Sequence, residues 1–374
     1  MKIEDKRHTV TMRTLTPVHV GSGNLLQNNI EFVEDNIEEE CSDIFVIDPK
    51  KVIGLIGIHN VDTWVTALET GKELKGLIAR LGGCSDPEKF SKRVITNYAG
   101  IKKNTTLKEC IHDARGLAYI PGSSIKGAIR TAVLATIAAK KSARELEELI
   151  KSNRFSGSNV EKLLFGNTPN ESIFRFLQIG DAYFPEQSEI SLNAININIT
   201  QRESLIDDGK AQVIEAIAEE KATTFTIKLA SQQNKEFSSQ NKVMRLPQEM
   251  SSIEELFRTI NSHTLKLVES EIEFWKKVSE VMTDGENYIE NLETIKDVIG
   301  NCTEGKECVL RIGHASGWRF TTGAWTEELG IFEEIVNISR PGNKKQYNQY
   351  DFPKSRRVGD GYSDTFGFVK LILK

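Results

Sequence analysis

The chain has 374 residues, a formal net charge of −5, 39% hydrophobic residues and 27% charged residues. This composition is typical of a soluble globular protein with roughly two to three domains, and the negative charge excludes a protein that coats nucleic acid over its whole surface. No apolar run reaches the length of a membrane span and the first residues lack the apolar core of a signal peptide, so we expect a cytoplasmic protein. The five cysteines are scattered without a Cys-x-x-Cys pair, which indicates neither a disulfide framework nor a zinc site.

The first predicted strand, 8–15, leads directly into a stretch that is rich in glycine. Alternating residues predict the strand, and Pro17, Gly21 and Gly23 then interrupt it. Glycines at this spacing allow the backbone to approach a ligand closely. His19 in the same stretch leaves two alternatives open: a hydrogen bond to a backbone or phosphate group, or general acid/base chemistry on RNA.

An acidic cluster between Glu31 and Glu40 surrounds a predicted hairpin, and we interpret it as a solvated loop that faces away from RNA. Residues 44–47 predict a strand. Helical patterns from about 49 to 93 then predict a helical insertion.

The central stretch combines a turn, a helix start and two basic residues. A Pro-Gly pair marks the turn, and Ser123 or Ser124 is a suitable N-cap for the helix that follows. Lys126 and Arg130 lie one turn apart on a face of their own, and the predicted cap puts Lys126 in the first turn, where the helix dipole favours anions. Free backbone N–H groups, serine hydroxyls and a lysine at a helix N-terminus predict a phosphate site. The alternative is a capped helix with two solvated basic residues. An apolar residue recurs every four positions on the buried face of this helix: Ile125, Ile129, Val133 and Ile137.

Periodicity predicts the elements that follow. Asp181, at a predicted strand end, is interpreted as a turn former, and Ser252 with Glu255 forms a capping box that begins a long helix. The predicted elements are, in chain order, helix 142–151, strand 174–182, strand 192–200, strand 222–230, helix 251–281, helix 288–299 and strand 307–313.

The C-terminal part carries a local excess of positive charge. Residues 314–323 follow a predicted strand as a glycine-broken loop that contains Trp318 and Arg319. Residues 340–357 contain six basic residues against one acid, Asp351, and several aromatic residues lie between them. Such a segment neutralises phosphates while its rings stack on bases; the alternative is a flexible solvated loop. A glycine-rich loop then enters a last strand at 367–371.

Together these stretches resemble the RAMP proteins of type III CRISPR effector complexes. In those proteins a Pro-Gly-Ser-Ser-x-Lys-Gly-x-x-Arg sequence opens a helix beside the guide RNA, and a glycine-rich loop lies near the C-terminus. Strand-helix-strand order, repeated after a helical insertion, predicts the matching α+β fold of two ferredoxin-like (RRM-like) modules with glycine-rich loops and helical insertions. The resemblance covers, in order, Thr16–Gly23, Ile120–Thr131, Leu164–Gly166 with Asp181, Arg311–Thr322 and Gly361–Leu371.

Size, the large insertion and an Arg-x-Gly-x-x-x-Gly-Trp segment are most similar to the fifth subunit of the Csm series in type III-A complexes. This resemblance implies a non-catalytic RNA-binding subunit that caps the complex at the 3′ end of the CRISPR guide RNA. It also implies contact with the repeated Csm backbone subunit and other Csm subunits, and support of guide maturation in antiviral defence. We predict no cofactor. The predicted domains are an N-terminal RRM-like module at 1–200 with its insertion at about 49–93, a β/helical insertion at 201–300 and a C-terminal RRM-like segment with basic glycine-rich loops at 301–374.

The residues predict no catalytic group and no metal ligand, because no metal-ligand spacing, Ser/His/Asp grouping or carboxylate pair within a recognised motif is present. Two other functions stay open, namely a RAMP endoribonuclease that uses His19 as general acid/base and a nucleotide- or phosphate-binding enzyme built on the helix start. The predicted RNA-binding residues are His19, Gly21, Ser22, Gly23, Gly122, Ser123, Ser124, Lys126, Arg130, Arg311, Trp318, Arg319, Lys344, Lys345, Arg356, Arg357 and Gly361.

Overall fold

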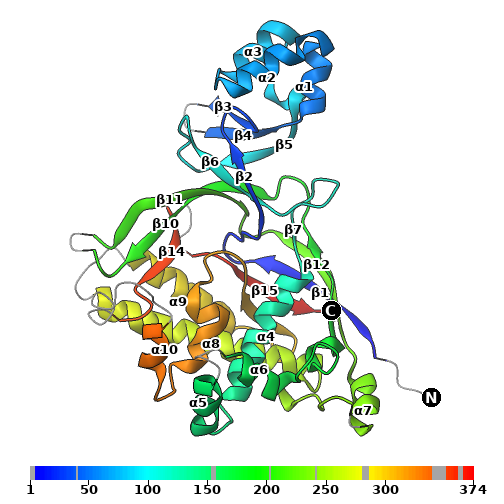
Figure 1. The fold of residues 1–374 in the computed structure, drawn as a ribbon, viewed down its shortest axis with the longest axis vertical. Coiled ribbons are helices and arrows are strands. Elements are labelled where there is room, and N and C mark those ends of the chain that lie inside the picture. Colours follow the sequence, from blue (N-terminus) through cyan, green and yellow to red (C-terminus); the bar gives the residue numbers. More distant parts are fainter. Residues whose placement is uncertain are drawn as a thin grey trace.

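The computed structural model of the protein combines two large β-sheets with helices that cover them (Figure 1). The fold is of the mixed α+β class, as predicted. Within the described ranges, no helix has both the length and the apolarity needed to cross a membrane. The structure describes residues 5–38, 41–152, 157–201, 204–240, 242–279, 286–338, 351–360 and 365–374.

The first sheet has the strand order β13-β15-β1-β12-β8, and each neighbouring pair is antiparallel. Val10, Met12 and Thr14 of β1 are fully buried, whereas Arg13, between the last two, is exposed. This pattern confirms the alternation predicted for the strand. The three predicted domain ranges are interleaved here, because each contributes at least one strand. The strands are β1 (Arg7–Thr14), β8 (Leu177–Ile179), β12 (Ala222–Leu229), β13 (Glu307–Arg311) and β15 (Phe368–Leu373).

Helices α4 (Gly122–Ala138) and α8 (Ile253–Ser279) pack in the same hydrophobic core as this sheet. The predicted apolar stripe of α4 is confirmed, since Ile129 and Val133 are fully buried. The capping box is also confirmed, because the Glu255 N–H donates to Ser252 Oγ at 3.1 Å. The other helices of this part of the chain are α5 (Ala143–Ser152), α6 (Ser158–Phe165), α7 (Ser231–Ser239), α9 (Glu286–Gly300) and α10 (Phe332–Ile338).

The second sheet has the order β2-β6-β11-β10-β5-β4-β3, and β14 also pairs with β10. One prediction was wrong here, because Gly21, Ser22 and Gly23 begin strand β2 instead of forming a loop. The end of the basic segment at 340–357, for which a flexible loop was the alternative, lies in strand β14. The strands are β2 (Gly21–Gln27), β3 (Phe32–Glu38), β4 (Cys41–Ile47), β5 (Ser91–Asn97), β6 (Thr106–Cys110), β10 (Glu189–Asn198), β11 (Ile206–Ile217) and β14 (Ser355–Asp360); a small separate sheet joins β7 (Tyr119–Ile120) and β9 (Ala182–Tyr183).

The predicted helical insertion is present between β4 and β5. It consists of α1 (Pro49–Ile56), α2 (Val61–Glu69) and α3 (Leu74–Gly82), and it lies at the end of the molecule farthest from α5 (Figure 1). Its apolar side chains form a separate small core with Val33 of β3 and Phe45 of β4. Strands β3 and β4 pair antiparallel as the predicted hairpin, and the described part of the acidic cluster lies on β3 and just before it.

Candidate nucleic-acid interface

The N-terminus of helix α4 is occupied by a carboxylate of the chain itself. The Gly122 N–H donates to Asp181 Oδ1 at 2.7 Å. Pro121 is the N-cap and makes no side-chain cap bond, so the prediction that Ser123 or Ser124 caps the helix was wrong. The helix therefore begins earlier than predicted, and Lys126 lies in its second turn. A phosphate at this helix end would have to displace Asp181.

Gly122 is required by the protein's own packing. A Cβ at this position would lie 2.3 Å from the Ile179 carbonyl oxygen, far inside van der Waals contact. The glycine thus lets α4 approach the end of β8 closely. At Gly122 the backbone therefore approaches another strand of the protein, and this packing alone accounts for the glycine.

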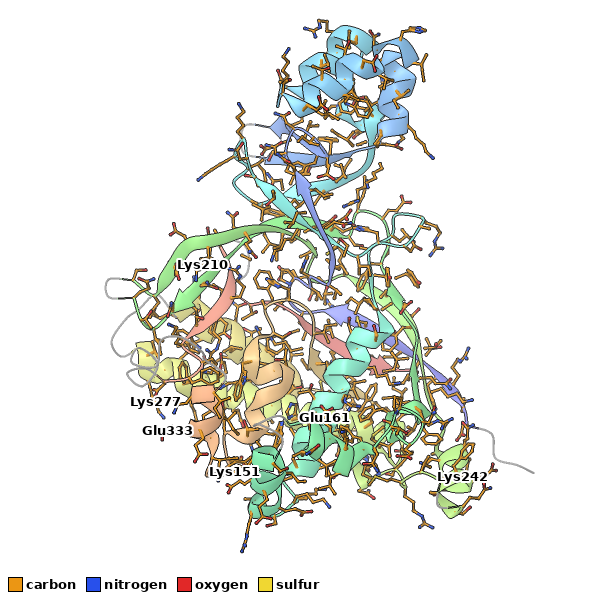
Figure 2. All side chains as sticks on the ribbon, viewed as in Figure 1. Lys151, Glu161, Lys210, Lys242, Lys277 and Glu333 are labelled. Carbon is orange, nitrogen blue, oxygen red and sulfur yellow. The ribbon has the colours of Figure 1, made fainter. Side chains whose placement is uncertain are left out.

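Lys126 and Arg130 instead lie on the flank of α4, where both line one groove and Arg130 also lines a second. The first groove is lined by both residues together with Lys162 and Arg175, and by the turn Gly166–Pro169. Figure 2 shows Glu161, which also lines this groove, close to α4 and α6. The flank thus collects basic groups from three parts of the chain.

The second groove lies on the other side of Arg130. It is lined by Ser124 and Thr131 of α4, by Arg311 at the end of β13, and by Gly313 and Phe320 from the segment after β13. The structure therefore brings two of the predicted RNA-binding stretches together. The segment itself is helical in part, with a turn of π-helix at Arg319–Gly323, so the prediction of a loop at 314–323 was wrong.

The two basic residues on this flank differ in their partners. Arg130 forms an ion pair with Glu161 at 2.8 Å, and its guanidinium lies over the rings of Phe165 and Phe174. Lys126 has no ion pair among the described residues. Burial, and then the neighbouring charge of Arg130, lower the pKa of Lys126. A half-buried cation beside a second cation is stabilised by an anion, which makes the Lys126 ammonium the best-placed phosphate ligand of the flank.

His19 is buried, with 4% of its surface exposed. Its Nδ1 lies 2.6 Å from the Glu215 carbonyl oxygen, and because a carbonyl only accepts, Nδ1 carries the proton. Burial lowers the pKa of His19, and its ring packs edge to face on His314 at 5.5 Å. Of the two alternatives left open by the sequence, the backbone hydrogen bond is the one that is present.

The stretch after β1 and the stretch after β13 lie side by side. The His314 N–H donates to the His19 carbonyl oxygen at 2.8 Å. A Cβ on Gly313 would lie 2.4 Å from that same oxygen, and the φ of Gly313 is +80°, so both space and conformation require glycine. Motifs almost 300 residues apart in the sequence are thus parts of one structural unit.

The arginines of the C-terminal part surround a buried carboxylate. Glu271 accepts hydrogen bonds from Arg319 Nη1 and Arg356 Nη2, each at 2.9 Å, and also from Trp275 and Tyr288. Burial alone would raise the pKa of Glu271, but the charges of Arg356 and Arg319 outweigh it and lower the pKa to about 2. Both arginines are buried. In this structure their guanidinium groups neutralise the buried Glu271 carboxylate and link the segments around it.

The remaining predicted residues lie at different depths. Arg311 is buried and donates from Nε to the Phe366 carbonyl oxygen, and Trp318 packs on Phe352. Arg357 is partly exposed and donates to the carbonyl oxygen of Lys210 in β11, a residue that Figure 2 labels. The exposed start of β2 carries Gly21, Ser22 and Gly23. Lys344, Lys345 and Gly361 lie outside the described residues.

The sequence analysis missed Lys162 and Arg175, which line the groove beside Lys126. Neither is part of a local motif. Only the packing of α6 and the following turn against α4 brings them to the flank, so no signal in the linear sequence could have identified them.

The chain belongs to the RAMP superfamily, because the family model matches residues 11–320. It is also 27% identical over 182 residues to the "CRISPR system Cms protein Csm5" of Methanocaldococcus jannaschii. That match covers 46% of this chain and 42% of the archaeal protein, so it spans less than half of the relative's length.

Two solved structures share the fold. One is a chain of the cryo-EM structure of a Csm-crRNA-target RNA ternary complex in a type III-A CRISPR-Cas system, with a TM-score of 0.70 and 20% identity over 99% of this chain and 100% of that chain. The other is the crystal structure of T. onnurineus Csm5, with a TM-score of 0.65 and 18% identity over 96% and 99% of the two chains. The predicted similarity to RAMP proteins, and among them to the fifth Csm subunit, is confirmed.

Proposed function

We propose that this chain is a non-catalytic, RNA-binding subunit of a type III-A Csm complex. The observation that carries the proposal is the flank of α4, where Lys126 lies half-buried, without an ion pair among the described residues, in a groove that further basic side chains line. The name and titles of the similar proteins, which include a Csm-crRNA-target RNA complex, support the guide RNA and other Csm subunits as partners. We extend the proposal to capping of the complex at the 3′ end of the guide, contact with the repeated backbone subunit and support of guide maturation.

The proposed binding is independent of the guide sequence. Lys126, with Arg130, contacts phosphate oxygens along the flank of α4, and such contacts fix the position of a strand without reading its bases. The C-terminal basic segment, with Lys344 and Lys345, adds further phosphate contacts. The buried arginines Arg319 and Arg356 act indirectly, since they hold the segment that lines the second groove.

Strand order supports one ferredoxin-like module in the first sheet. The order β15-β1-β12-β8 with antiparallel neighbours, α4 between β1 and β8, and α8 between β12 and β15, is the β-α-β-β-α-β pattern of that fold. The second sheet with its helical insertion is the proposed second module. Both proposed modules draw on strands from distant parts of the chain.

The surroundings of His19 and Asp181 support the absence of catalysis in this proposal. His19 is buried and hydrogen-bonded to backbone, and Asp181 accepts the Gly122 N–H at the start of α4. A general base has to come within hydrogen-bond reach of the proton that it removes. His19 is not free to do so in this structure, and the Asp181 carboxylate already accepts hydrogen bonds from the Gly122 N–H and the Tyr183 hydroxyl.

The test of the interface is a salt titration of guide-RNA binding by the full chain. Replacing Lys126 with Ala removes one phosphate contact, so the slope of log K against log salt becomes shallower by about 0.7 to 0.9. Lys151→Ala is the matched control, because it removes the same charge from an exposed position on α5 (Figure 2). An unchanged slope in Lys126→Ala, or an equal change in Lys151→Ala, would contradict the assignment of the phosphate contact.

Co-purification from the native host tests the assembly. We expect the affinity-tagged chain to recover uniform CRISPR guide RNAs together with the repeated Csm backbone subunit. Recovery of the chain alone, free of RNA, would overturn the proposed function.

A further inference from the structure

A second cluster of polar side chains lies near the junction of the two sheets, outside the α4 flank. His112 follows β6, Glu189 begins β10 and Glu215 lies in the last part of β11. One ligand-type atom of each residue lies within 4.8 Å of the others, and the side chains are only 9%, 6% and 0% exposed. We propose that these three residues bind one divalent transition-metal ion, with Zn²⁺ as the ion that best fits the donors.

The hydrogen bonds of His112 fix which ring nitrogen faces the carboxylates. Nδ1 lies 2.8 Å from the Cys110 carbonyl oxygen, and since a carbonyl only accepts, Nδ1 carries a proton. Nε2 then faces Glu189 Oε1, 3.2 Å away, and Glu215 Oε1, 3.7 Å away. A metal ion between these atoms would accept the Nε2 lone pair and one oxygen from each carboxylate. An Nδ1–H donated to a backbone carbonyl is also the usual outer hydrogen bond of a metal-bound histidine.

The donor distances suit a metal ion. Two ligands at about 2.0 to 2.1 Å from a tetrahedral zinc ion lie about 3.3 to 3.4 Å apart. The separations of 3.2 and 3.7 Å from His112 Nε2 therefore need shifts of less than about half an ångström, and the two carboxylate oxygens lie within 4.8 Å of each other. An imidazole with two carboxylates suits Zn²⁺ or Mn²⁺, whereas Ca²⁺ and Mg²⁺ favour all-oxygen ligands.

The surrounding charge also favours a cation. Arg93 is shared between two carboxylates, with Nε 3.0 Å from Glu215 Oε1 and Nη2 3.1 Å from Glu109 Oε1. Glu189 is a third carboxylate in the same cluster. Glu215 Oε1 accepts one bond from Arg93 and keeps a second lone pair for a metal. A divalent ion would balance the excess negative charge that one guanidinium leaves.

The cluster borders an opening through Glu189, which lines it together with Arg93, Arg115, Glu186 and Gln187. An ion would reach the other two ligands past Glu189. The Glu215 carbonyl oxygen binds His19 of the stretch after β1. A metal on the Glu215 side chain would therefore tie β6, β10 and β11 of the second sheet to the connection with the first sheet.

The test is a metal titration of the full chain, purified without a histidine tag and stripped with EDTA. We expect one equivalent of Zn²⁺ per chain after gel filtration, measured by elemental mass spectrometry, and visible absorption bands of bound Co²⁺ when cobalt replaces zinc. At a Zn²⁺ concentration 100-fold above its Kd, the melting temperature rises by about 3 °C for a chain of this length. The absence of stoichiometric Zn²⁺ and Co²⁺ would overturn the proposal.

Variants locate the bound ion. Glu189→Gln and His112→Gln preserve side-chain volume approximately and each is expected to abolish stoichiometric binding. Glu186→Gln is the matched control, since Glu186 lines the same opening without being one of the three ligands. Binding that persists in both ligand variants would show that the ion lies elsewhere and would also overturn the proposal. Because the readout is metal content, the result is independent of guide-RNA binding.

Discussion

Two buried carboxylates, Glu271 and Glu215, have opposite electrostatic surroundings. Glu271 receives two guanidinium groups, from Arg319 and Arg356, and its pKa falls to about 2. Glu215 shares Arg93 with Glu109, and burial raises the pKa of Glu215 although Arg93 lowers it. The comparison shows that a buried carboxylate alone says little about its role. The ratio of cations to carboxylates separates an internally compensated ion cluster from one that can still accept a cation.

The largest expected effect comes from removing the charge at the compensated cluster. Glu271→Gln leaves Arg319 and Arg356 buried without their carboxylate, so the free energy of unfolding falls by about 3 to 5 kcal/mol. Urea denaturation measures this loss. Glu273→Gln, an exposed position on the same helix, is the matched control and is expected to change stability by less than about 0.5 kcal/mol. Equal losses in the two variants would contradict the ion cluster.

Acid titration tests the same cluster without a change in packing. A depressed folded-state pKa means that Glu271 stabilises the fold fully above its unfolded pKa of about 4.3, and that this stabilisation is lost as pH falls toward 2. The lost contribution is about 3 kcal/mol. The stability difference between wild type and Glu271→Gln should therefore shrink between pH 5 and pH 2.5. A difference that stays constant over this window would refute the lowered pKa.

Asp181 extends the comparison to a carboxylate balanced by a helix N-terminus. Asp181→Ala removes the acceptor of the Gly122 N–H and should lower the free energy of unfolding by about 1 kcal/mol. The freed helix end should also make thermal stability of the variant respond more strongly to added phosphate than that of wild type. Asp181→Asn, which keeps an acceptor oxygen, is the control. If phosphate stabilised wild type and Asp181→Ala equally, Asp181 would not be occupying an anion site.

Elements with a strong local pattern could be predicted from the sequence. The stripe of α4, the capping box of Ser252 and Glu255, and the alternation of β12 depend on residues within one element, and all of them are confirmed. In β10 the predicted alternation is present only from Ile195 onward, because Ala194 and Ile195 are both buried at a register shift. Strand β14 was missed because its residues are mostly charged or glycine. Its pairing with β10, more than 150 residues earlier, is what defines it.

The candidate site was harder to predict because its partners are distant in the sequence. Lys126 and Arg130 were found because they lie in one local motif, a turn and helix start with basic residues one turn apart. The burial of Arg319 and Arg356 depends on Glu271, which lies 48 and 85 positions earlier in the chain. Asp181, which accepts the Gly122 N–H at the start of α4, lies 59 positions later in the chain. Local charge and aromatic content cannot distinguish an arginine that faces RNA from one that neutralises a distant buried carboxylate.

Strand β1 sits between β12 and β15, and Val10 pairs with Leu373. During synthesis at about 5 to 20 residues per second, β1 therefore waits on the order of 20 to 70 seconds for its second neighbour to leave the ribosome. Throughout that interval one edge of β1 remains without its ladder partner. Pairing with β12 is the earliest event that can cover the other edge. Such long-range strand pairing makes folding slow and leaves an aggregation-prone edge on the growing chain, so the order of translation becomes part of how this subunit reaches its native state.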